Sequence, residues 1–263
     1  MAPKKQDRQS RQSRERLRAY QARRAVHDKT LARRRRDNVF ASIGLVIVLV
    51  LAVVAQVSYF GAGPGKSSAS AASTTDLCTQ KPDAKNTGDV PARSVSECRT
   101  WTGTMTINSV PLGIRLDGRK APQAVASTVS LIQKGFYTGV SCHRLTTGGF
   151  FVLQCGDPTG DGTGGPGYSY GPLENVPKDN LYPAGTIAMA RSTGNPQSQG
   201  SQFFIVYKDT TISADAAGGY TVIGSVTSGL PELAKAVTDA GVADGSTDGK
   251  PKVPTVITSV TVR

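Results

Sequence analysis

Hydrophobic and polar positions change their pattern several times along this 263-residue chain. Residues 1–38 are polar and rich in arginine, residues 39–60 are continuously apolar, and residues 61–75 contain almost only small residues. From Trp101 onward, short runs alternate apolar and polar residues, which is the pattern of half-buried strands. The pattern therefore predicts a polar tail, an apolar segment, a linker and one folded domain.

The alternating region predicts a mainly β domain with two helices. One helix is expected from Pro122 to Gly135 and another from Pro231 to Gly241, because proline favours the first turn and glycine ends a helix. Strands are predicted around Met105 and Ile107, around Ile114 and Leu116, and over Ser141–Leu145, Phe150–Gln154, Thr186–Ala190, Gln202–Tyr207, Tyr220–Val226 and Thr255–Val262. So many strands with two helices indicate an antiparallel barrel or an α+β domain.

The apolar segment from Val39 to Phe60 is predicted to be a transmembrane helix. Its 22 residues include no charge. At about 1.5 Å per residue the helix would span about 33 Å, enough for a bilayer core of about 30 Å. A buried soluble helix would normally show a polar face. The apolar run and the basic stretch before it are longer than in a typical cleaved signal peptide, so an uncleaved signal anchor is expected.

Basic residues concentrate in the tail. The net charge of the chain is +12, and residues 1–38 carry +10 of it, from 14 Lys and Arg against 4 Asp and Glu. This excess places a disordered tail in the cytoplasm and the domain outside, in a single-pass protein of the cell membrane. The tail is expected to fix this topology and to lie on lipid; the alternative is RNA or DNA binding, although Tyr20 is its only aromatic residue. The remaining residues carry only +2 (+12 less +10), so no nucleic-acid-binding domain is expected.

Four cysteines are expected to be oxidised if the domain lies outside the cytoplasm. Cys78 and Cys98 flank one short loop, whereas Cys142 and Cys155 lie on two consecutive strands that would face each other in a hairpin. We predict the bridges Cys78–Cys98 and Cys142–Cys155; the alternative is four buried free thiols. The predicted segments are a tail (1–38), a signal anchor (39–60), a linker that contains the first cysteine pair (61–100) and the folded domain (101–263).

The chain offers few residues for metal or hydrolytic chemistry. It has two histidines, His27 in the tail and His143 in the domain, and its cysteines form no C-x-x-C pair. Zinc sites and histidine-based triads need more partners than His143 alone supplies. No H-E-x-x-H or P-loop pattern occurs. No metal and no cofactor is therefore expected, and His143 is interpreted as a structural core residue.

Five sequence blocks resemble the signature of the cyclophilins and occur in the same order: Gly135–Leu145, Gly149–Pro158, Gly185–Ala190, Gly200–Ile205 and Tyr220–Gly224. More narrowly, the chain resembles the membrane-anchored cyclophilins of actinobacteria. The resemblance implies a closed eight-stranded antiparallel barrel with two capping helices. It also implies peptidyl-prolyl cis–trans isomerase activity on proline-containing polypeptides.

The resemblance also implies site residues. Arg144 takes the place of the catalytic arginine, and Phe151 and Gln154 match the pocket phenylalanine and the glutamine of the family motif. The residues that match substrate-binding positions are Val152, Ala190, Gln202, Phe204, Ile212 and Tyr220. Phe204 is expected at the base of the proline pocket, and Ala190 is expected to shape the peptide groove.

The chain departs from the family pattern at the groove. Arg191 replaces the usual asparagine, Val152 stands where the family usually has methionine, and Tyr220 stands where many eukaryotic members have histidine. The stretch 210–219 lacks the family's tryptophan, and Ile212 is its nearest apolar substitute. Only weak cyclosporin binding is therefore expected, together with an altered groove specificity.

Three functions remain in view. The first is an isomerase that assists the folding of secreted or cell-envelope proteins. The second is a proline-peptide-binding chaperone or scaffold with little turnover, which Arg191 and the missing tryptophan favour and the intact Arg144 set opposes. The third, a membrane protein that tethers nucleic acid, rests only on the basic tail.

Overall fold

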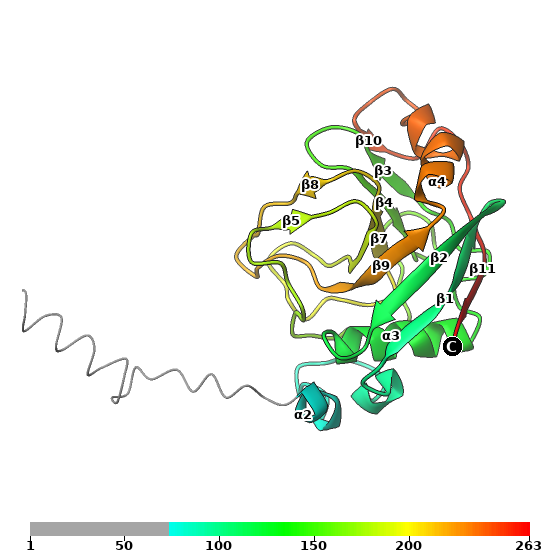
Figure 1. Cartoon of the computed structure of the whole chain (residues 1–263). Coiled ribbons are helices and arrows are strands. Elements are labelled where there is room, and N and C mark those ends of the chain that lie inside the picture. Colours follow the sequence, from blue (N-terminus) through cyan, green and yellow to red (C-terminus); the bar gives the residue numbers. More distant parts are fainter. Residues whose placement is uncertain (1–73) are drawn as a thin grey trace, which may run out of the picture. The chain divides into compact units, whose positions relative to one another are not determined.

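The computed structural model describes residues 74–263, which belong to one compact unit extending from Ala71 to Arg263 (Figure 1). Within this described part, no helix is both long and apolar enough to cross a membrane. The predicted tail (1–38) and signal anchor (39–60) lie outside the described residues. Both therefore stay predictions.

The described residues form a mainly β fold with two antiparallel sheets. The strands are β1 (Thr100–Ile107), β2 (Val110–Asp117), β3 (Arg144–Thr146), β4 (Val152–Cys155), β5 (Leu181–Tyr182), β6 (Thr186–Met189), β7 (Phe203–Val206), β8 (Thr210–Thr211), β9 (Val222–Ser228), β10 (Asp248–Gly249) and β11 (Ile257–Val262). Nine of them form one sheet in the order β10-β3-β4-β7-β6-β9-β2-β1-β11, and β5 pairs with β8.

Helices accompany the sheet at its ends and at the start of the described chain. They are α2 (Thr74–Thr79), the 3₁₀ helix η1 (Arg93–Ser96), α3 (Pro122–Gln133), α4 (Leu230–Ala236) and the 3₁₀ helix η2 (Thr238–Ala240). Figure 1 shows α3 and α4 near opposite ends of the sheet. The two predicted helices thus exist, and each begins at or beside its proline.

The nine-stranded sheet is curled. The edge strand β11 and the residues just before it bond to the segment that precedes β3. The N–H of Cys142 donates to the carbonyl oxygen of Thr255, and the N–H of Ile257 donates to that of Val140, both at 2.9 Å. These bonds join β11, at one edge of the sheet, to the segment that leads into β3 near the other edge, so the sheet curls back on itself. The prediction of a mainly β domain is therefore confirmed, with a curled sheet as its main layer. The structure has more strands than the eight expected, because the two-residue strands β5, β8 and β10 are too short to show an alternating pattern in the sequence.

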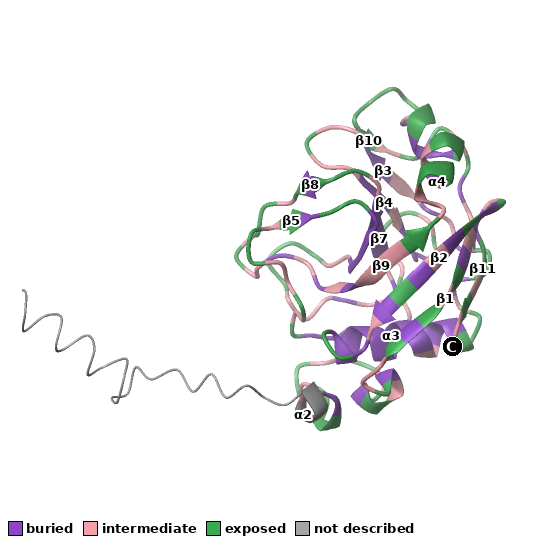
Figure 2. Cartoon of the chain, viewed as in Figure 1, coloured by how far each residue is buried: buried purple, intermediate pink, exposed green. Residues whose placement is uncertain are grey.

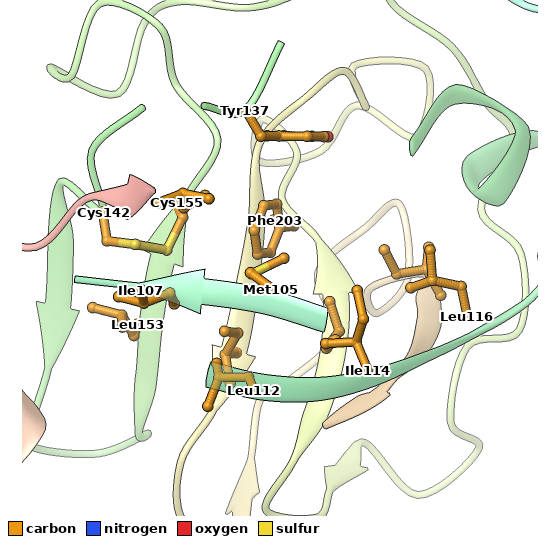
Figure 3. Packing of buried hydrophobic residues seen from close by; sticks show 14 of the residues in the cluster. Met105, Ile107, Leu112, Ile114, Leu116, Tyr137, Cys142, Leu153, Cys155 and Phe203 are labelled. Carbon is orange, nitrogen blue, oxygen red and sulfur yellow. A yellow bond between two sulfur atoms is a disulfide. The ribbon is translucent and has the colours of Figure 1, made fainter. Parts of the chain in front are cut away.

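The core lies inside the curl. Alternate residues of β1 and β2 face inward, which is the period-2 pattern that the sequence displays. Figure 3 shows Met105 of β1 beside Phe203 of β7, with Tyr137 above them, and Ile114 of β2 belongs to the same core cluster. The hydroxyl of Tyr137 donates to the carbonyl oxygen of Ser201 at 3.1 Å, so this buried polar group is satisfied.

Helix α3 is buried on nearly all sides, whereas α4 is mostly exposed (Figure 2). Gln123 and Ser127 of α3 are both buried, and the Ser127 hydroxyl shares a 2.8 Å hydrogen bond with the hydroxyl of Tyr168. Gln123 Nε2 donates to the carbonyl oxygen of Pro91 at 2.9 Å. The carboxylate of Glu174 accepts the N–H groups of Gln123 and Ala124 at 3.1 and 3.0 Å, where the first turn of a helix lacks partners.

Residues 77–100, which the sequence places in the linker, belong to this compact unit. Thr87 exchanges two backbone hydrogen bonds with Ser169, at 2.9 and 3.0 Å, and Trp101 Nε1 donates to the carbonyl oxygen of Ser96 at 2.8 Å. Arg93 and Cys78 are buried. The compact unit therefore begins before the predicted boundary at Trp101.

Both predicted disulfides are present. Cys78 is bonded to Cys98, and Cys142 is bonded to Cys155. The second pair lies in the core beside Ile107 (Figure 3). The first pair closes the segment that covers α3, so each bridge joins parts of the chain that also pack together.

Candidate active site

The candidate site lies across β3, β4, β7 and β6. In the antiparallel register, Arg144 stands opposite Gln154, Gln154 opposite Phe204, and Phe204 opposite Ala188. Directly opposed residues of neighbouring strands project from the same face of a sheet. The register therefore places the predicted arginine, glutamine and pocket phenylalanine side by side, although they lie up to 60 residues apart in the sequence.

A chain of polar hydrogen bonds runs along this face. Arg144 Nη1 donates to Gln154 Oε1 at 3.2 Å, and Gln154 Nε2 donates to Gln202 Oε1 at 2.9 Å. Gln202 Nε2 in turn donates to the carbonyl oxygens of Gly162 and Gly164, at 2.9 and 2.8 Å. Both amides are thus oriented by their partners, and Gln154 presents its oxygen to the guanidinium.

Asp157 anchors the loop that receives Gln202. Its side chain is buried and accepts the backbone N–H groups of Thr159, Asp161 and Gly162. Burial raises the pKa of Asp157, but the hydrogen bonds that begin with Thr159 outweigh it and lower the pKa overall. The carboxylate therefore keeps its charge and holds the loop.

The guanidinium of Arg144 has a second partner that the sequence did not reveal. Nε and Nη2 of Arg144 donate to the two carboxylate oxygens of Asp248, at 2.7 and 2.6 Å. Asp248 lies on β10, beside β3. This pairing raises the pKa of Arg144 and lowers that of Asp248, so both groups are charged at neutral pH.

Beside the polar chain lies a cluster of apolar residues. Its buried members are Val152, Tyr182, Ala188, Phe204 and Val206, and its half-buried members are Phe150, Ala190, Ile212, Tyr220 and Val222. The ring of Phe204 packs edge-on against Tyr220, with 5.4 Å between the ring centroids. The structure thus brings together five of the predicted substrate-binding residues, Val152, Ala190, Phe204, Ile212 and Tyr220.

Phe151 does not join this cluster. Its ring packs against Tyr207, with 5.9 Å between the centroids, and Lys208 Nζ lies 4.7 Å from its centroid. Phe150 is in the cluster instead, with the guanidinium carbon of Arg144 5.6 Å from its ring centroid. Both phenylalanines lie just before β4, which begins at Val152. Phe151 thus packs apart from the apolar cluster, and its role in the pocket stays a prediction.

A cavity of about 360 Å³ adjoins the other end of the polar chain. Its walls include Gln154, Gln202 and Ala190, together with backbone of the glycine-rich loop. Arg191, also in the wall, has a side chain only 1% exposed and donates to both carboxylate oxygens of Asp215 at 2.8 Å. Arg191 therefore anchors the loop 215–219 and does not project its charge into the groove.

His143 is next to the site but makes no polar contact there. Neither ring nitrogen has a hydrogen-bond partner among the described residues, and burial lowers the pKa of the imidazole. Over residues 74–263, His, Cys, Asp and Glu form no cluster suited to a metal ion. The chemical groups that remain for function are the guanidinium of Arg144, the amides of Gln154 and Gln202, and the apolar cluster.

The profile of the family "cyclophilin type peptidyl-prolyl cis-trans isomerase/CLD" matches residues 102–262. The chain belongs to this family, and the curled mainly β fold and the row from Arg144 to Phe204 are consistent with that assignment.

Curated proteins and solved structures agree with the family. A Mycobacterium tuberculosis protein described as "probable peptidyl-prolyl cis-trans isomerase B" is 46% identical over 169 residues, which cover 60% of this chain and 53% of that protein. A peptidyl-prolyl cis-trans isomerase of Helicobacter pylori is 39% identical over 52% of this chain and 80% of its own length. The chain thus spans about half the length of the mycobacterial relatives that it matches.

Among solved structures, a cyclophilin-type isomerase of Cryptosporidium parvum, crystallised in the presence of the dipeptide Ala-Pro, superposes with a TM-score of 0.51. It is 25% identical, and the match covers 62% of this chain and 98% of that one. The likeness is that of the fold.

Proposed function

We propose that this chain is a membrane-anchored peptidyl-prolyl cis–trans isomerase. The observation that carries the proposal is the guanidinium of Arg144, held by Gln154 and Asp248 at the edge of the apolar cluster around Phe204. A charged planar donor set beside a ring-sized apolar floor is the arrangement that prolyl isomerisation needs.

Rotation about the prolyl amide bond is slow because the C–N bond has partial double-bond character, and the barrier is about 18–20 kcal/mol. No covalent bond has to form or break. In the twisted state the imide nitrogen regains its lone pair and can accept a hydrogen bond. Arg144 supplies that donor, and its charge is permanent because a guanidinium stays protonated in proteins. A donor that binds only the twisted state lowers the barrier.

The apolar cluster keeps the proline ring still while the rest of the peptide turns. Val152 and Phe204 are buried, and Phe150 and Ile212 form half-buried sides. Gln154 and Gln202 present amide groups along the same face and can hold the peptide backbone. The substrates on this proposal are proline-containing segments of polypeptides.

The proposed location is the outer face of a cell membrane, with secreted or cell-envelope proteins as clients. Support comes from the apolar run 39–60, the charge of +10 before it and the four cysteines, which are all paired in the described part of the chain. Paired cysteines are typical of oxidising compartments. The proposal includes weak cyclosporin binding, because Ile212 supplies no indole N–H donor.

The function is tested by a protease-coupled isomerisation assay on a proline-containing peptide, with the full chain in detergent micelles. We expect single-exponential cis-to-trans conversion that is faster than the uncatalysed reaction and proportional to enzyme concentration. Peptide binding without acceleration would instead support the alternative of a proline-binding chaperone or scaffold. The buried position of the Arg191 side chain removes one of the two arguments for that alternative.

A further inference from the structure

The guanidinium of Arg144 donates three hydrogen bonds within the protein. A guanidinium has five N–H donors. Two, on Nε and Nη2, point to the carboxylate of Asp248, and one, on Nη1, points to Gln154. Two N–H groups therefore remain, one on each terminal nitrogen, and these are the donors available to a substrate.

Asp248 is itself held in place by the fold. It pairs with Thr146 through the β10–β3 ladder. The hydroxyl of Ser246 donates to the carbonyl oxygen of Asp248 at 3.0 Å, and the N–H of Thr147 donates to the carbonyl oxygen of Thr247 at 2.8 Å. The carboxylate thus approaches Arg144 from a strand that starts 104 residues later in the chain, on the side opposite Gln154.

We propose that Asp248 is a positioning residue for isomerisation: its carboxylate fixes the plane of the Arg144 guanidinium and leaves two N–H donors aimed at the prolyl imide. The proposal rests on the proposed function. An arginine side chain without this partner would have to be ordered during each catalytic event, which raises the barrier. Gln154 alone cannot prevent rotation, because it receives a single hydrogen bond from the guanidinium.

The same ion pair contributes little to stability. The side chains of Arg144 and Asp248 are 37% and 49% exposed, and ion pairs in such positions are screened by water. The two interpretations of Asp248 thus predict different measurements. A structural ion pair would change turnover only through folding, whereas a positioning residue changes turnover in a folded protein with an unchanged melting temperature.

The experiment uses the full chain in detergent micelles and the variants Asp248→Ala, Asp248→Asn, Arg144→Ala and Asp248→Ala/Arg144→Ala. We expect Asp248→Ala to lower kcat about tenfold, the lower end of what a charge-assisted hydrogen bond contributes, with KM within about twofold of the wild type because the apolar cluster is untouched. Asp248→Asn keeps the shape and one acceptor, and it should lose less. Glu232→Ala, at an exposed position of α4, is the control and should keep the wild-type rate.

Two further readouts separate positioning from structure. In the Arg144→Ala background, Asp248→Ala should cause no additional loss, because its effect acts through Arg144. Sodium formate should restore part of kcat to Asp248→Ala and nothing to Arg144→Ala, since the site is half exposed and formate offers the same two oxygens. Sodium chloride at equal ionic strength should restore neither.

Specific outcomes overturn the proposal. Wild-type kcat in a folded Asp248→Ala variant contradicts it, as does an equal loss in the presence and absence of Arg144. If Asp248→Ala fails to fold, Asp248→Asn is measured in the same cycle with the same expectations of direction. A wild-type rate in Arg144→Ala would instead contradict the proposed role of Arg144 itself, so the two failures are distinguishable.

Discussion

At the scale of single residues, the proposed function gives Arg144 and Phe204 different roles toward the same substrate. Under this proposal Arg144 offers charge and hydrogen-bond donors to the twisted imide, whereas Phe204, which packs against Tyr182 and Tyr220, is the floor for the proline ring. Loss of the donor should therefore raise the barrier, and loss of the ring should weaken binding. The two substitutions give opposite kinetic patterns.

We predict that Arg144→Ala lowers kcat by about ten- to a hundredfold, the equivalent of about 1.5–3 kcal/mol for a charge-assisted hydrogen bond. Arg144→Lys should recover little, because an ammonium lacks the planar fork. Phe204→Ala should mainly raise KM. The measurement is steady-state isomerisation, with Arg115→Ala on the exposed side of β2 as control. The assignment is falsified if a folded Arg144→Ala variant isomerises peptide at the wild-type rate.

Ile212 determines the expected affinity for cyclosporin. It is half buried against the apolar cluster, at the position nearest to the tryptophan that the family pattern contains. An indole adds a large apolar face and an N–H donor, so we predict that Ile212→Trp tightens cyclosporin binding. Calorimetric titration measures the effect, with Leu181→Trp, at an exposed position, as control. Unchanged affinity in Ile212→Trp would contradict this prediction.

His143 makes stability depend on pH. Burial lowers its folded-state pKa below 6.5, and Arg144 adds to this lowering while Asp157 and Asp161 oppose it. The unfolded chain, with a histidine pKa of about 6.5, therefore binds a proton at a higher pH than the folded chain does. Stability is retained above about pH 6.5 and falls as the pH decreases through this value toward the lower folded pKa.

We expect the melting temperature of the wild type to fall more between about pH 7.5 and pH 5.5 than that of His143→Leu. The upper part of this range lies above the pKa values of ordinary carboxyl groups. His27→Leu, in the N-terminal tail, is the control and should behave as the wild type. Equal losses in all three proteins would show that His143 does not cause the dependence.

At the scale of elements, the segment between Cys78 and Cys98 covers α3 and contacts the loop around Ser169. It accounts for the burial of Gln123, whose Nε2 donates to the carbonyl oxygen of Pro91 in this segment. The second bridge lies elsewhere: Cys142 comes two residues before Arg144, and Cys155 directly follows Gln154. Removal of the second bridge should therefore affect catalysis, whereas removal of the first should not.

We predict that Cys78→Ser/Cys98→Ser lowers the free energy of unfolding by about 3 kcal/mol, the loop-entropy contribution of a bridge that closes about 20 residues, and leaves kcat unchanged. Cys142→Ala/Cys155→Ala should lower both stability and kcat, because it frees the strands that carry Arg144. Urea unfolding without reductant and the isomerisation assay measure the two effects. Four reactive thiols in the denatured, unreduced wild type would contradict both pairings.

At the scale of the whole molecule, the distribution of charge and apolar residues predicts one orientation in the membrane. The positive charge lies before Val39, and the compact unit lies after Phe60. Positively charged flanks stay in the cytoplasm. The isomerase domain would then meet polypeptides as they emerge on the outer side.

We predict that protease added to intact cells expressing the full chain degrades the domain and spares a protected fragment containing residues 1–38. Antibodies against the two ends of the chain, with an endogenous cytoplasmic protein as control, measure this outcome. If only residues 1–38 were accessible, the orientation would be the reverse of the predicted one. Protection of both ends from the protease would contradict a location at the cell surface.

The sequence by itself determined much of this protein, because local patterns encode local structure. Period-2 alternation marked β1 and β2, and proline and glycine marked the limits of α3. The family blocks identified Arg144, Gln154, Gln202 and Phe204, which the register then brought into contact. Cysteine spacing was enough to pair the four cysteines.

The side chains that come from distant parts of the sequence and complete the site are visible only in the folded structure. Phe150 packs in the apolar cluster, whereas Phe151 packs against Tyr207, and the motif does not distinguish these two environments. Asp248, which binds Arg144, lies on the two-residue strand β10, and this strand is too short for a sequence pattern to predict. The burial of Arg191 and α3 likewise depends on segments that are distant in sequence. Such contacts arise from packing between elements, and packing is a property of the folded chain that no local pattern records.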